Sequence, residues 1–384
     1  MNTICVDQGA SSTRYVVNEG EVYVNPNNMV FIDEDVDTYL VPNSADMFDN
    51  FDITINKIDG ESNYFPVRAL IGTLAERYKP ANIRPSMNSN KSRQRVNYVS
   101  IITAVAAGIL NTNIEPDVAV IIDFPPLEAN KMTADYIRSE LLGKFKVKFN
   151  TSAFNKEVEF TISDARIVSE SEQASVSFFF NRNGAPRVET AKYNRGYVLS
   201  CDIGASTSDF VLIKDRRFQE RTGQTYKIGG NVIKEIIKNK VRALYGSELT
   251  DEDAEVVITE GRLPYGSKYK DMSKELIEAK KEFAEMLAQD IDSYFGTVGV
   301  PLMSIKAIFV SGGGSMKSSY FDIDNNTEVV TSEPVSTYLT EVLRNICDGI
   351  DVVGYPDENP RMANIIGTML STKALRMAWS NNNL

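Results

Sequence analysis

Apolar and polar positions alternate along this chain in blocks that predict strands and helices in turn. Asp117–Phe124 is apolar almost throughout, which is typical of a strand covered on both faces. Tyr98–Leu110 predicts an alanine-rich helix buried on most sides, and Lys274–Phe295 predicts an amphipathic helix with one apolar face. Val67–Tyr78 also has its apolar residues at helical spacing. Strands and helices that alternate in both halves favour an α/β architecture.

Shorter segments extend this pattern. The alternation in Lys146–Ile162 predicts a β-hairpin, and Val168–Phe180 predicts a helix. Another helix is expected to begin at Gly229-Gly230-Asn231, where Asn231 suits the capping position. Arg361–Trp379 predicts a last helix, which we expect to pack on the body of the protein rather than to anchor it in a membrane.

One strand–turn–strand pattern occurs twice, about half the chain apart. Asp7-Gln-Gly-Ala-Ser-Ser-Thr-Arg14 matches Asp202-Ile-Gly-Ala-Ser-Thr-Ser-Asp209, and each copy directly follows an apolar strand. A single copy would most simply be a polar β-turn. Two matched copies instead favour a duplicated α/β domain that presents the same loop in each half.

The residues of these two loops suit a phosphate group. Gly9 and Gly204 allow a tight turn and let backbone amides approach an anion. Hydroxyl groups that can donate to phosphate oxygens come from both loops, at Ser11, Ser12, Ser206 and Thr207. Asp7 and Asp202 would repel phosphate unless a divalent cation lay between these carboxylates and the phosphate groups, which favours Mg²⁺ bound through its waters. Arg14 adds a positive charge for a β- or γ-phosphate, so the two loops predict a clamp on a nucleotide polyphosphate.

The composition narrows the possible chemistry. The 384 residues include no histidine, which excludes Ser-His-Asp triads, Cys-His nucleophile pairs and HExxH zinc sites. The three cysteines form no CxxC pair, so we expect neither a zinc site nor a disulfide framework. We expect the protein to lie in the cytoplasm, where thiols stay reduced. No apolar run approaches the roughly 18 residues that span a bilayer, so no membrane partner is expected.

The charge balance bears on possible partners. With 41 Lys and Arg against 52 Asp and Glu, the formal net charge is −11. An acidic chain repels phosphate backbones, so direct binding to nucleic acid is not expected. Lys91, Arg93 and Arg95 cluster in one polar segment, which we interpret as a solvated turn.

In these motifs the chain resembles the actin-like ATPase superfamily, which also includes sugar kinases and the large heat-shock chaperones. Asp7–Arg14 is similar to the first phosphate loop of that family, with Arg14 where the family usually has Lys, and Asp202–Asp209 is similar to the second. Glu170 falls where the first connecting helix of the family carries the acid or Gln that positions the attacking water. Glu172 and Gln173 remain alternatives for that role.

Two further segments carry the resemblance. Phe309–Met316 is similar to the adenosine motif, in which glycines let the backbone face the base and ribose. The resemblance implies nucleotide contacts there, with Met316 against the adenine ring, from Gly312, Gly313, Gly314, Ser315 and Met316. Ala363–Gly367 resembles the second connecting segment at the interdomain hinge. Asn231 and Lys238 are candidates to reach the ribose or base, although for Asn231 the role of helix cap is the favoured one.

The resemblance implies an α/β fold of duplicated actin-like (ribonuclease H-like) domains around a nucleotide cleft. Domain I would span residues 1–180, with a smaller subdomain at about 31–80 and a C-terminal helix at about 361–384 packed back on it. Domain II would span residues 181–360, with a smaller helical subdomain at about 226–300.

In that cleft the resemblance implies ATP or GTP together with Mg²⁺. The phosphates would be bound by residues of both loops, which are Gly9, Ala10, Ser11, Ser12, Thr13 and Arg14 in the first and Gly204, Ala205, Ser206 and Thr207 in the second. Asp7 and Asp202 would hold the metal through water and would form the catalytic group with Glu170.

Within the superfamily, the compact length and the loop sequences look most like the bacterial plasmid-segregation (ParM-type) actins. This resemblance implies a cytoplasmic ATPase that forms head-to-tail filaments and moves plasmid DNA through a separate DNA-binding adaptor. One alternative is a small-molecule kinase of the same superfamily, acting on a sugar or an acid. A second alternative is a nucleotide-binding regulator that does not polymerise.

Overall fold

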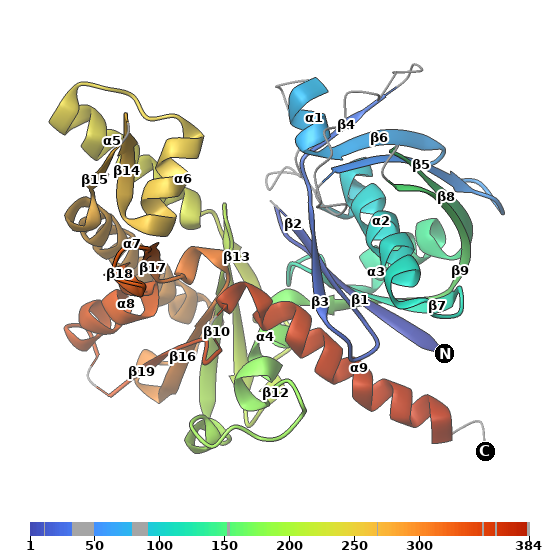
Figure 1. Ribbon diagram of the computed structural model, residues 1–384. Helices are drawn as coiled ribbons and strands as arrows, with labels where there is room; N and C mark the ends of the chain where they lie inside the picture. Colours follow the sequence, from blue (N-terminus) through green and yellow to red (C-terminus); the bar gives the residue numbers. More distant parts are fainter. Residues whose placement is uncertain are drawn as a thin grey trace. The chain divides into compact units, whose positions relative to one another are not determined.

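The chain divides into two compact units (Figure 1). Unit 1 comprises Met1–Val176 and Asn364–Leu384, and unit 2 comprises Ser177–Ala363. The computed structural model describes residues 1–10, 12–32, 50–78, 91–151, 154–266, 268–347, 349–357 and 359–381. Ser11 of the first loop lies outside the described residues, as does much of the predicted subdomain at about 31–80.

One mixed sheet forms the base of unit 1. Its strands are β1 (Asn2–Gln8), β2 (Ser12–Val17), β3 (Val22–Pro26), β4 (Met29–Phe31), β5 (Asn50–Lys57), β6 (Val67–Gly72), β7 (Asp117–Phe124), β8 (Gly143–Thr151) and β9 (Phe154–Ser169). Across the sheet they run in the order β3-β2-β1-β7-β9-β8-β5-β6-β4. β7 pairs in parallel with both β1 and β9, so the carboxyl ends of these three strands meet at one edge.

Helices cover both faces of the central strands, which explains their continuous apolar sequence. The helical segments of unit 1 are α1 (Thr73–Tyr78), η1 (Lys91–Arg93), α2 (Arg95–Thr112), α3 (Lys131–Leu141), the first two turns of α4 (Glu170–Phe179) and nearly all of α9 (Ala363–Asn381). On β7, Val120 and Ile122 face the core that α2 shares, whereas Asp123 faces Thr368 of α9. In Figure 1, α2 and α3 lie within the curve of the sheet.

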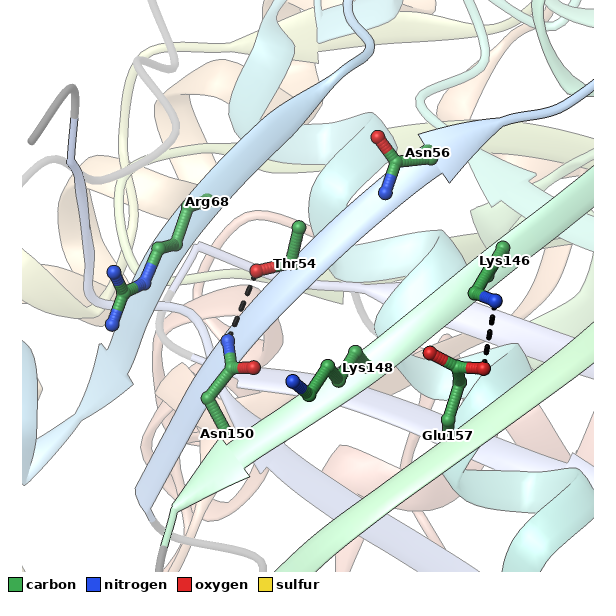
Figure 2. A pocket seen from close by; sticks show the side chains of 7 residues that line it. All are labelled: Thr54, Asn56, Arg68, Lys146, Lys148, Asn150 and Glu157. Atoms are coloured by element: carbon green, nitrogen blue, oxygen red, sulfur yellow. Dashed lines mark hydrogen bonds and ion pairs between the residues drawn. The ribbon is translucent and has the colours of Figure 1, made fainter. Parts of the chain in front are cut away.

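The opposite face of the outer strands carries a polar hollow of about 550 Å³ (Figure 2). Arg68 forms a two-point ion pair with Asp52 there, and Lys146 pairs with Glu157. The lining residues are Thr54, Asn56, Arg68, Lys146, Lys148, Asn150 and Glu157. None of the residues that the sequence predicts for the nucleotide site lines this hollow.

Unit 2 is built on a second sheet and two separate hairpins. The sheet strands are β10 (Tyr197–Ile203), β11 (Ser208–Lys214), β12 (Arg217–Phe218), β13 (Gln224–Tyr226), β16 (Ile305–Ser311) and β19 (Asp351–Gly354). The hairpins are β14 (Arg262–Tyr265) with β15 (Lys268–Asp271), and β17 (Ser318–Asp322) with β18 (Thr327–Ser332). The helical segments are η2 (Ala191–Tyr193), α5 (Gly230–Tyr245), α6 (Asp251–Glu260), α7 (Ser273–Val298), η3 (Leu302–Ser304), η4 (Gly313–Ser315), α8 (Val335–Arg344) and η5 (Pro360–Met362).

The two sheets repeat one topology, which confirms the duplication predicted from the loops. Unit 1 contains the run β3-β2-β1-β7-β9, and unit 2 contains β12-β11-β10-β16-β19. In both runs an antiparallel hairpin precedes strands that pair in parallel. The hairpin turns also close alike, because Gly9 N donates to Ser12 O at 3.0 Å and Gly204 N donates to Thr207 O at 2.8 Å.

Two predictions of local structure were wrong in part. Val67–Tyr78 is not one helix, because its first half is β6, whose residues pair with β4 and β5, and only its second half is α1. Val168–Phe180 likewise begins as the end of β9, and α4 starts at Glu170. In both cases pairing with strands distant in the sequence overrides the local apolar spacing.

Gly367 of α9 provides a test of the packing within unit 1. A Cβ atom at this position would lie 1.7 Å from the carbonyl oxygen of Gln173 in α4, so the two helices would have to separate. We predict that Gly367→Ala lowers the free energy of unfolding by about 2 kcal/mol or more, measured by urea denaturation.

The matched control is Gly296→Ala on α7, where a Cβ atom would meet nothing within 4 Å. Alanine should raise the stability there by about 0.5–1 kcal/mol, because it restricts the unfolded chain and favours the helix. Similar effects at the two positions would contradict the close contact between α4 and α9.

Candidate functional site

The first loop joins β1 to β2 and is bound by the side chain of Asn27, which follows β3. Asn27 Nδ2 donates to the carbonyl oxygen of Gly9, and Thr13 Oγ1 donates to Asn27 Oδ1 at 2.6 Å. Thr13 and Asn27 are buried. Asn27 therefore links the backbone of Gly9 to the side chain of Thr13, and it is a supporting residue that the sequence analysis missed.

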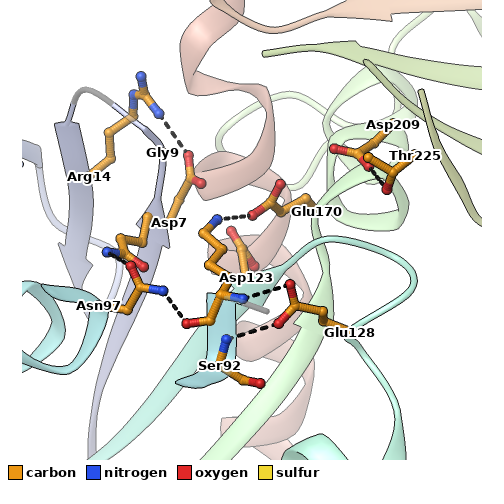
Figure 3. A network of polar contacts seen from close by, with 12 residues as sticks. Asp7, Gly9, Arg14, Ser92, Asn97, Asp123, Glu128, Glu170, Asp209 and Thr225 are labelled. Carbon is orange, nitrogen blue, oxygen red and sulfur yellow. Dashed lines mark hydrogen bonds and ion pairs between the residues drawn. The ribbon is translucent and has the colours of Figure 1, made fainter. Parts of the chain in front are cut away.

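Asp7 and Arg14 form an ion pair across the first hairpin (Figure 3). They are directly paired in the β1–β2 register, and Arg14 Nη1 lies 3.0 Å from Asp7 Oδ2. Arg14 Nη2 also donates to Ser12 Oγ at 3.3 Å. The guanidinium predicted to meet a phosphate is thus bound to the carboxylate predicted to face the metal, and it neutralises that carboxylate.

The second loop has a different charge at the equivalent position. Asp202 pairs with Asp209 across β10 and β11, as Asp7 does with Arg14 in unit 1. Asp202 accepts a hydrogen bond from Ser311 Oγ, and Asp209 accepts one from Thr225 Oγ1. Two carboxylates therefore lie where the first loop has a carboxylate and a guanidinium, so the second loop is the more attractive of the two to a cation.

The beginning of α5 holds the second loop. Gly230 N donates to Gly204 O at 2.9 Å, and Asn231 N donates to Ala205 O at 2.7 Å. The predicted helix cap at Asn231 was wrong, because Gly229 occupies that position. Asn231 Nδ2 instead donates to Ser206 Oγ at 3.1 Å.

Lys238, the other residue predicted to reach the nucleotide from this helix, is engaged elsewhere. It forms ion pairs with Asp251 of α6 and Glu235 of α5. The structure brings Asn231 to the second loop but shows no such contact for Lys238 among the described residues.

The glycine-rich turn after β16 packs directly on the second loop. Gly312 has a φ of 88°, and a Cβ atom there would lie 2.3 Å from the carbonyl oxygen of Ile203 and 2.4 Å from Asp202 Oδ1. A Cβ atom on Gly314 would lie 2.5 Å from Ile203 Cγ2. Glycine is thus required at both positions, and unit 2 brings its predicted phosphate loop and its predicted adenosine motif together.

A buried lysine supports the far side of this turn. Lys280 Nζ donates to Met316 O at 2.8 Å, to Ser318 Oγ at 2.9 Å and to Glu333 O at 3.1 Å. Burial lowers the pKa of Lys280 to about 7. Met316 is therefore fixed through its backbone, which leaves its half-buried side chain as the part that could contact a base.

Carboxyl groups gather at the carboxyl edge of the unit 1 sheet. Asp7 at the end of β1 is directly paired with Asp123 at the end of β7, and Glu170 follows the end of β9 (Figure 3). Asp123 was missed, although it ends an apolar strand as Asp7 and Asp202 do. That repeated position was the signal that could have found it.

Asp123 is fully buried, and its environment favours the protonated form. Thr368 Oγ1 donates to Oδ1, whereas Oδ2 has no hydrogen-bond partner among the described residues. Burial and then the charge of Asp7 raise the pKa of Asp123 well above its usual range, and the bond from Thr368 opposes this.

Glu170 begins α4 and is bound to Lys91. Lys91 Nζ lies 2.8 Å from Glu170 Oε1, and both side chains are almost completely buried. The interpretation of residues 91–95 as a solvated turn was therefore wrong at Lys91. Local sequence gave no sign of this burial, because the partner carboxylate lies in a distant segment.

The two alternatives to Glu170 have other surroundings. Gln173 Oε1 accepts a hydrogen bond from Ser371 Oγ of α9 at 2.6 Å, so its side chain takes part in helix packing. Burial raises the pKa of Glu172. Of these three residues, Glu170 lies with Asp7 and Asp123 at the edge of the sheet (Figure 3).

The oxygen-rich donors of the loops suit a hydrated Mg²⁺. Asp202 and Asp209 are adjacent carboxylates, and Asp123 has a buried oxygen with unused hydrogen-bonding capacity within the described chain. Across that same part of the chain, no cluster of three acidic or cysteine side chains is close enough to hold a metal directly. Contact of Mg²⁺ with Asp7 and Asp202 through waters stays a prediction from the sequence.

Comparison of sequences gives one partial match. A family model described as archaeal actin homologue MreB-like, C-terminal, matches residues 200–318, which include the second loop and the glycine-rich turn. No curated protein matches the chain.

Solved structures match over almost the whole chain. The crystal structure of actin-like protein Alp7A has a TM-score of 0.72 at 18% identity, covering 99% of this chain and 98% of that chain. The chain has the actin-like fold. The predicted fold class is thereby confirmed, and the resemblance seen in the sequence motifs extends to the fold.

Two ParM structures share this actin-like fold. A 15-stranded ParM filament from Clostridium botulinum has a TM-score of 0.63 at 19% identity, covering 97% of this chain and 99% of that chain. Bacillus thuringiensis ParM with ATP has a TM-score of 0.66 at 16% identity, covering 98% of this chain and 99% of that chain.

Within the described residues of the present chain, no helix has both the length and the apolar character needed to span a membrane.

Asp123 provides a pH-dependent test of the unit 1 edge. Its folded-state pKa lies above the unfolded value of about 3.9, so the unfolded chain releases this proton first as the pH rises. Wild-type stability is therefore reduced progressively above about pH 4. We predict that Asp123→Asn gains stability relative to the wild type as the pH rises from 4 to 7, measured by urea denaturation in metal-free buffer.

The control is Asp135→Asn, because Asp135 is an exposed acid on α3. Its stability difference from the wild type should stay nearly constant over the same pH range. A difference for Asp123→Asn that is constant, or that falls with pH, would show that Asp123 is not held in the protonated form.

Proposed function

We propose that the two loops together bind one ATP with Mg²⁺ and that the protein hydrolyses this ATP. The observation that carries the proposal is the same hairpin turn at the same position of both sheets. Backbone amides at such turns bind anions. That Bacillus thuringiensis ParM, a protein of similar fold, was solved with ATP supports the choice of nucleotide.

We assign the residues of the chain separate roles in binding and hydrolysing ATP. Loop amides and hydroxyls would bind the phosphates, the glycine-rich turn would face the ribose and base, and Glu170 would orient a water toward the γ-phosphorus. Asp7 and Asp202 would hold the waters of Mg²⁺, which when bound neutralises charge on the phosphate oxygens. Positioning and charge neutralisation supply most of the acceleration in phosphoryl transfer.

We further propose that the protein assembles head to tail into filaments. A ParM filament is among the structures of similar fold, which supports self-association. A heterologous contact that does not close on itself produces an open filament. Binding of ATP by both units would favour one arrangement of them, and hydrolysis would weaken that preference, so the nucleotide would set filament stability.

Plasmid DNA is the cargo that we propose, moved through a separate adaptor. The formal charge of −11 opposes direct contact with a phosphate backbone, so the adaptor would supply the DNA-binding surface.

Substitution at the two proposed catalytic acids tests the hydrolysis. Asp202→Ala should lower kcat by about 100-fold or more, because it removes charge from the second loop. Glu170→Ala should lower kcat similarly while leaving the Kd for ATP unchanged, because Glu170 would act on the water. Phosphate release and a fluorescent-nucleotide titration measure the two quantities.

The matched control is Asp324→Ala, at an exposed acid between β17 and β18. Wild-type rates are expected for this variant. A wild-type rate for Asp202→Ala would remove the proposed site, and lost ATP binding in Glu170→Ala would assign that residue a structural role instead.

Sedimentation tests the filament proposal. At high protein concentration, ATP with Mg²⁺ should give a pellet and increased light scattering, whereas the nucleotide-free protein should stay in the supernatant. Turnover that requires an added sugar or acid and gives no polymer would instead identify a small-molecule kinase. ATP binding with neither turnover nor polymer would identify a regulator.

A further inference from the structure

Lys91 is a buried cation whose position needs an explanation. Its side chain is 6% exposed and bonds Glu170, whose side chain is 10% exposed. Removing two charges from water is costly, and an apolar pair of similar volume is often at least as stable. Stability alone therefore gives little reason for a lysine at this position.

The backbone around Lys91 is fixed from three directions. The carboxylate of Glu128 accepts hydrogen bonds from the amides of Lys91 and Ser92, each at 2.9 Å (Figure 3). Tyr98 Oη donates to Ser92 O at 2.8 Å. Asn97 Nδ2 donates to Lys91 O, so both α2 and the segment after β7 hold this turn.

This support continues to the first loop. Gln8 Nε2 donates to Asn97 Oδ1, and Gln8 directly follows Asp7 in β1. A continuous chain of hydrogen bonds thus connects the end of β1 to the backbone of Lys91 and, through its ammonium group, to Glu170. Such a network fixes the geometry of the group at its end.

The charges at the sheet edge also assign distinct partners. Arg14 is bound to Asp7, and Lys91 is bound to Glu170. Glu170 Oε1 accepts the bond from Lys91, and a carboxylate has enough lone pairs to accept a further bond from a water. Lys91 can therefore hold Glu170 without replacing the water that Glu170 is proposed to orient.

We propose that Lys91 is a positioning residue for ATP hydrolysis, which holds the Glu170 carboxylate in the orientation that receives the attacking water. This inference rests on the proposed function of the site. It assigns Lys91 no contact with the nucleotide, so its removal should affect the chemical step rather than ATP binding.

The first test separates kcat from affinity, with ATP and Mg²⁺ and the full chain. Lys91→Met should lower kcat by about 10-fold or more, because a displaced catalytic group costs rate. The Kd for ATP should change less than twofold. Lys91→Arg keeps the charge and should recover part of the lost rate, whereas the control Lys148→Met, at an exposed lysine of β8, should match the wild type.

The second test is a double-mutant cycle with Glu170→Gln. Because Lys91 would act through Glu170, Lys91→Met/Glu170→Gln should be no slower than Glu170→Gln alone. The double variant removes both buried charges, so it keeps the test valid if Lys91→Met alone fails to fold. Thermal denaturation confirms that each variant is folded.

Three results would overturn the inference. Losses of rate that multiply in the double variant would show that Lys91 acts independently of Glu170. A wild-type rate in Lys91→Met would show no role, and a large loss of ATP affinity would make Lys91 a binding residue. These results leave the proposed hydrolysis intact, whereas a wild-type chain that binds ATP without turnover overturns both proposals.

Discussion

Parallel pairing of β1, β7 and β9 brings three acidic residues to one edge of one sheet, and their charges must be accommodated there. Asp7 and Glu170 are each bound to a cation, Arg14 and Lys91 respectively. Among the described residues Asp123 has no ion-pair partner. It accepts one hydrogen bond, from Thr368, and its pKa is raised instead. Like charges in nearly dry protein are tolerated only through such pairing or protonation. The loops, α9 and the turn before α2 all serve this requirement.

The two units apply one topology to different charges. In unit 1 the first hairpin pairs Asp7 with Arg14, whereas in unit 2 the equivalent hairpin pairs Asp202 with Asp209. The contacts that hold the second loop also differ from those of the first loop, because α5 and the glycine-rich turn both pack against the second loop. The duplication therefore supplies two turns of similar backbone, and the differences between their residues make the second turn the one better suited to a cation.

Sequence reasoning succeeded where local pattern decides the structure. β7 coincides with the predicted strand at Asp117–Phe124, and α2 contains the predicted buried helix, because continuous burial leaves a continuous apolar sequence. The repeated loops were visible because both turns need glycine and small polar residues at the same spacing. The residues of these two loops are the part of the candidate site that could be predicted from the sequence.

The predictions from the sequence that were wrong have a common physical cause. Lys91 is buried with the carboxylate of Glu170, its ion-pair partner from a distant segment. Val67 begins a strand because it pairs with β5. Neither partner can be read from the neighbouring residues. Asn231 was expected to cap its helix, but contact with Ser206 of the second loop gives it another role. Tertiary contacts decided each of these positions.

A crystal structure with a non-hydrolysable ATP analogue and Mg²⁺ would test the central claim most directly. The account predicts one nucleotide whose phosphates accept hydrogen bonds from the amides of both loops, at residues 9–14 and 204–207, with Glu170 facing the γ-phosphate. A nucleotide bound to only one of the two loops, or bound away from both, would contradict it.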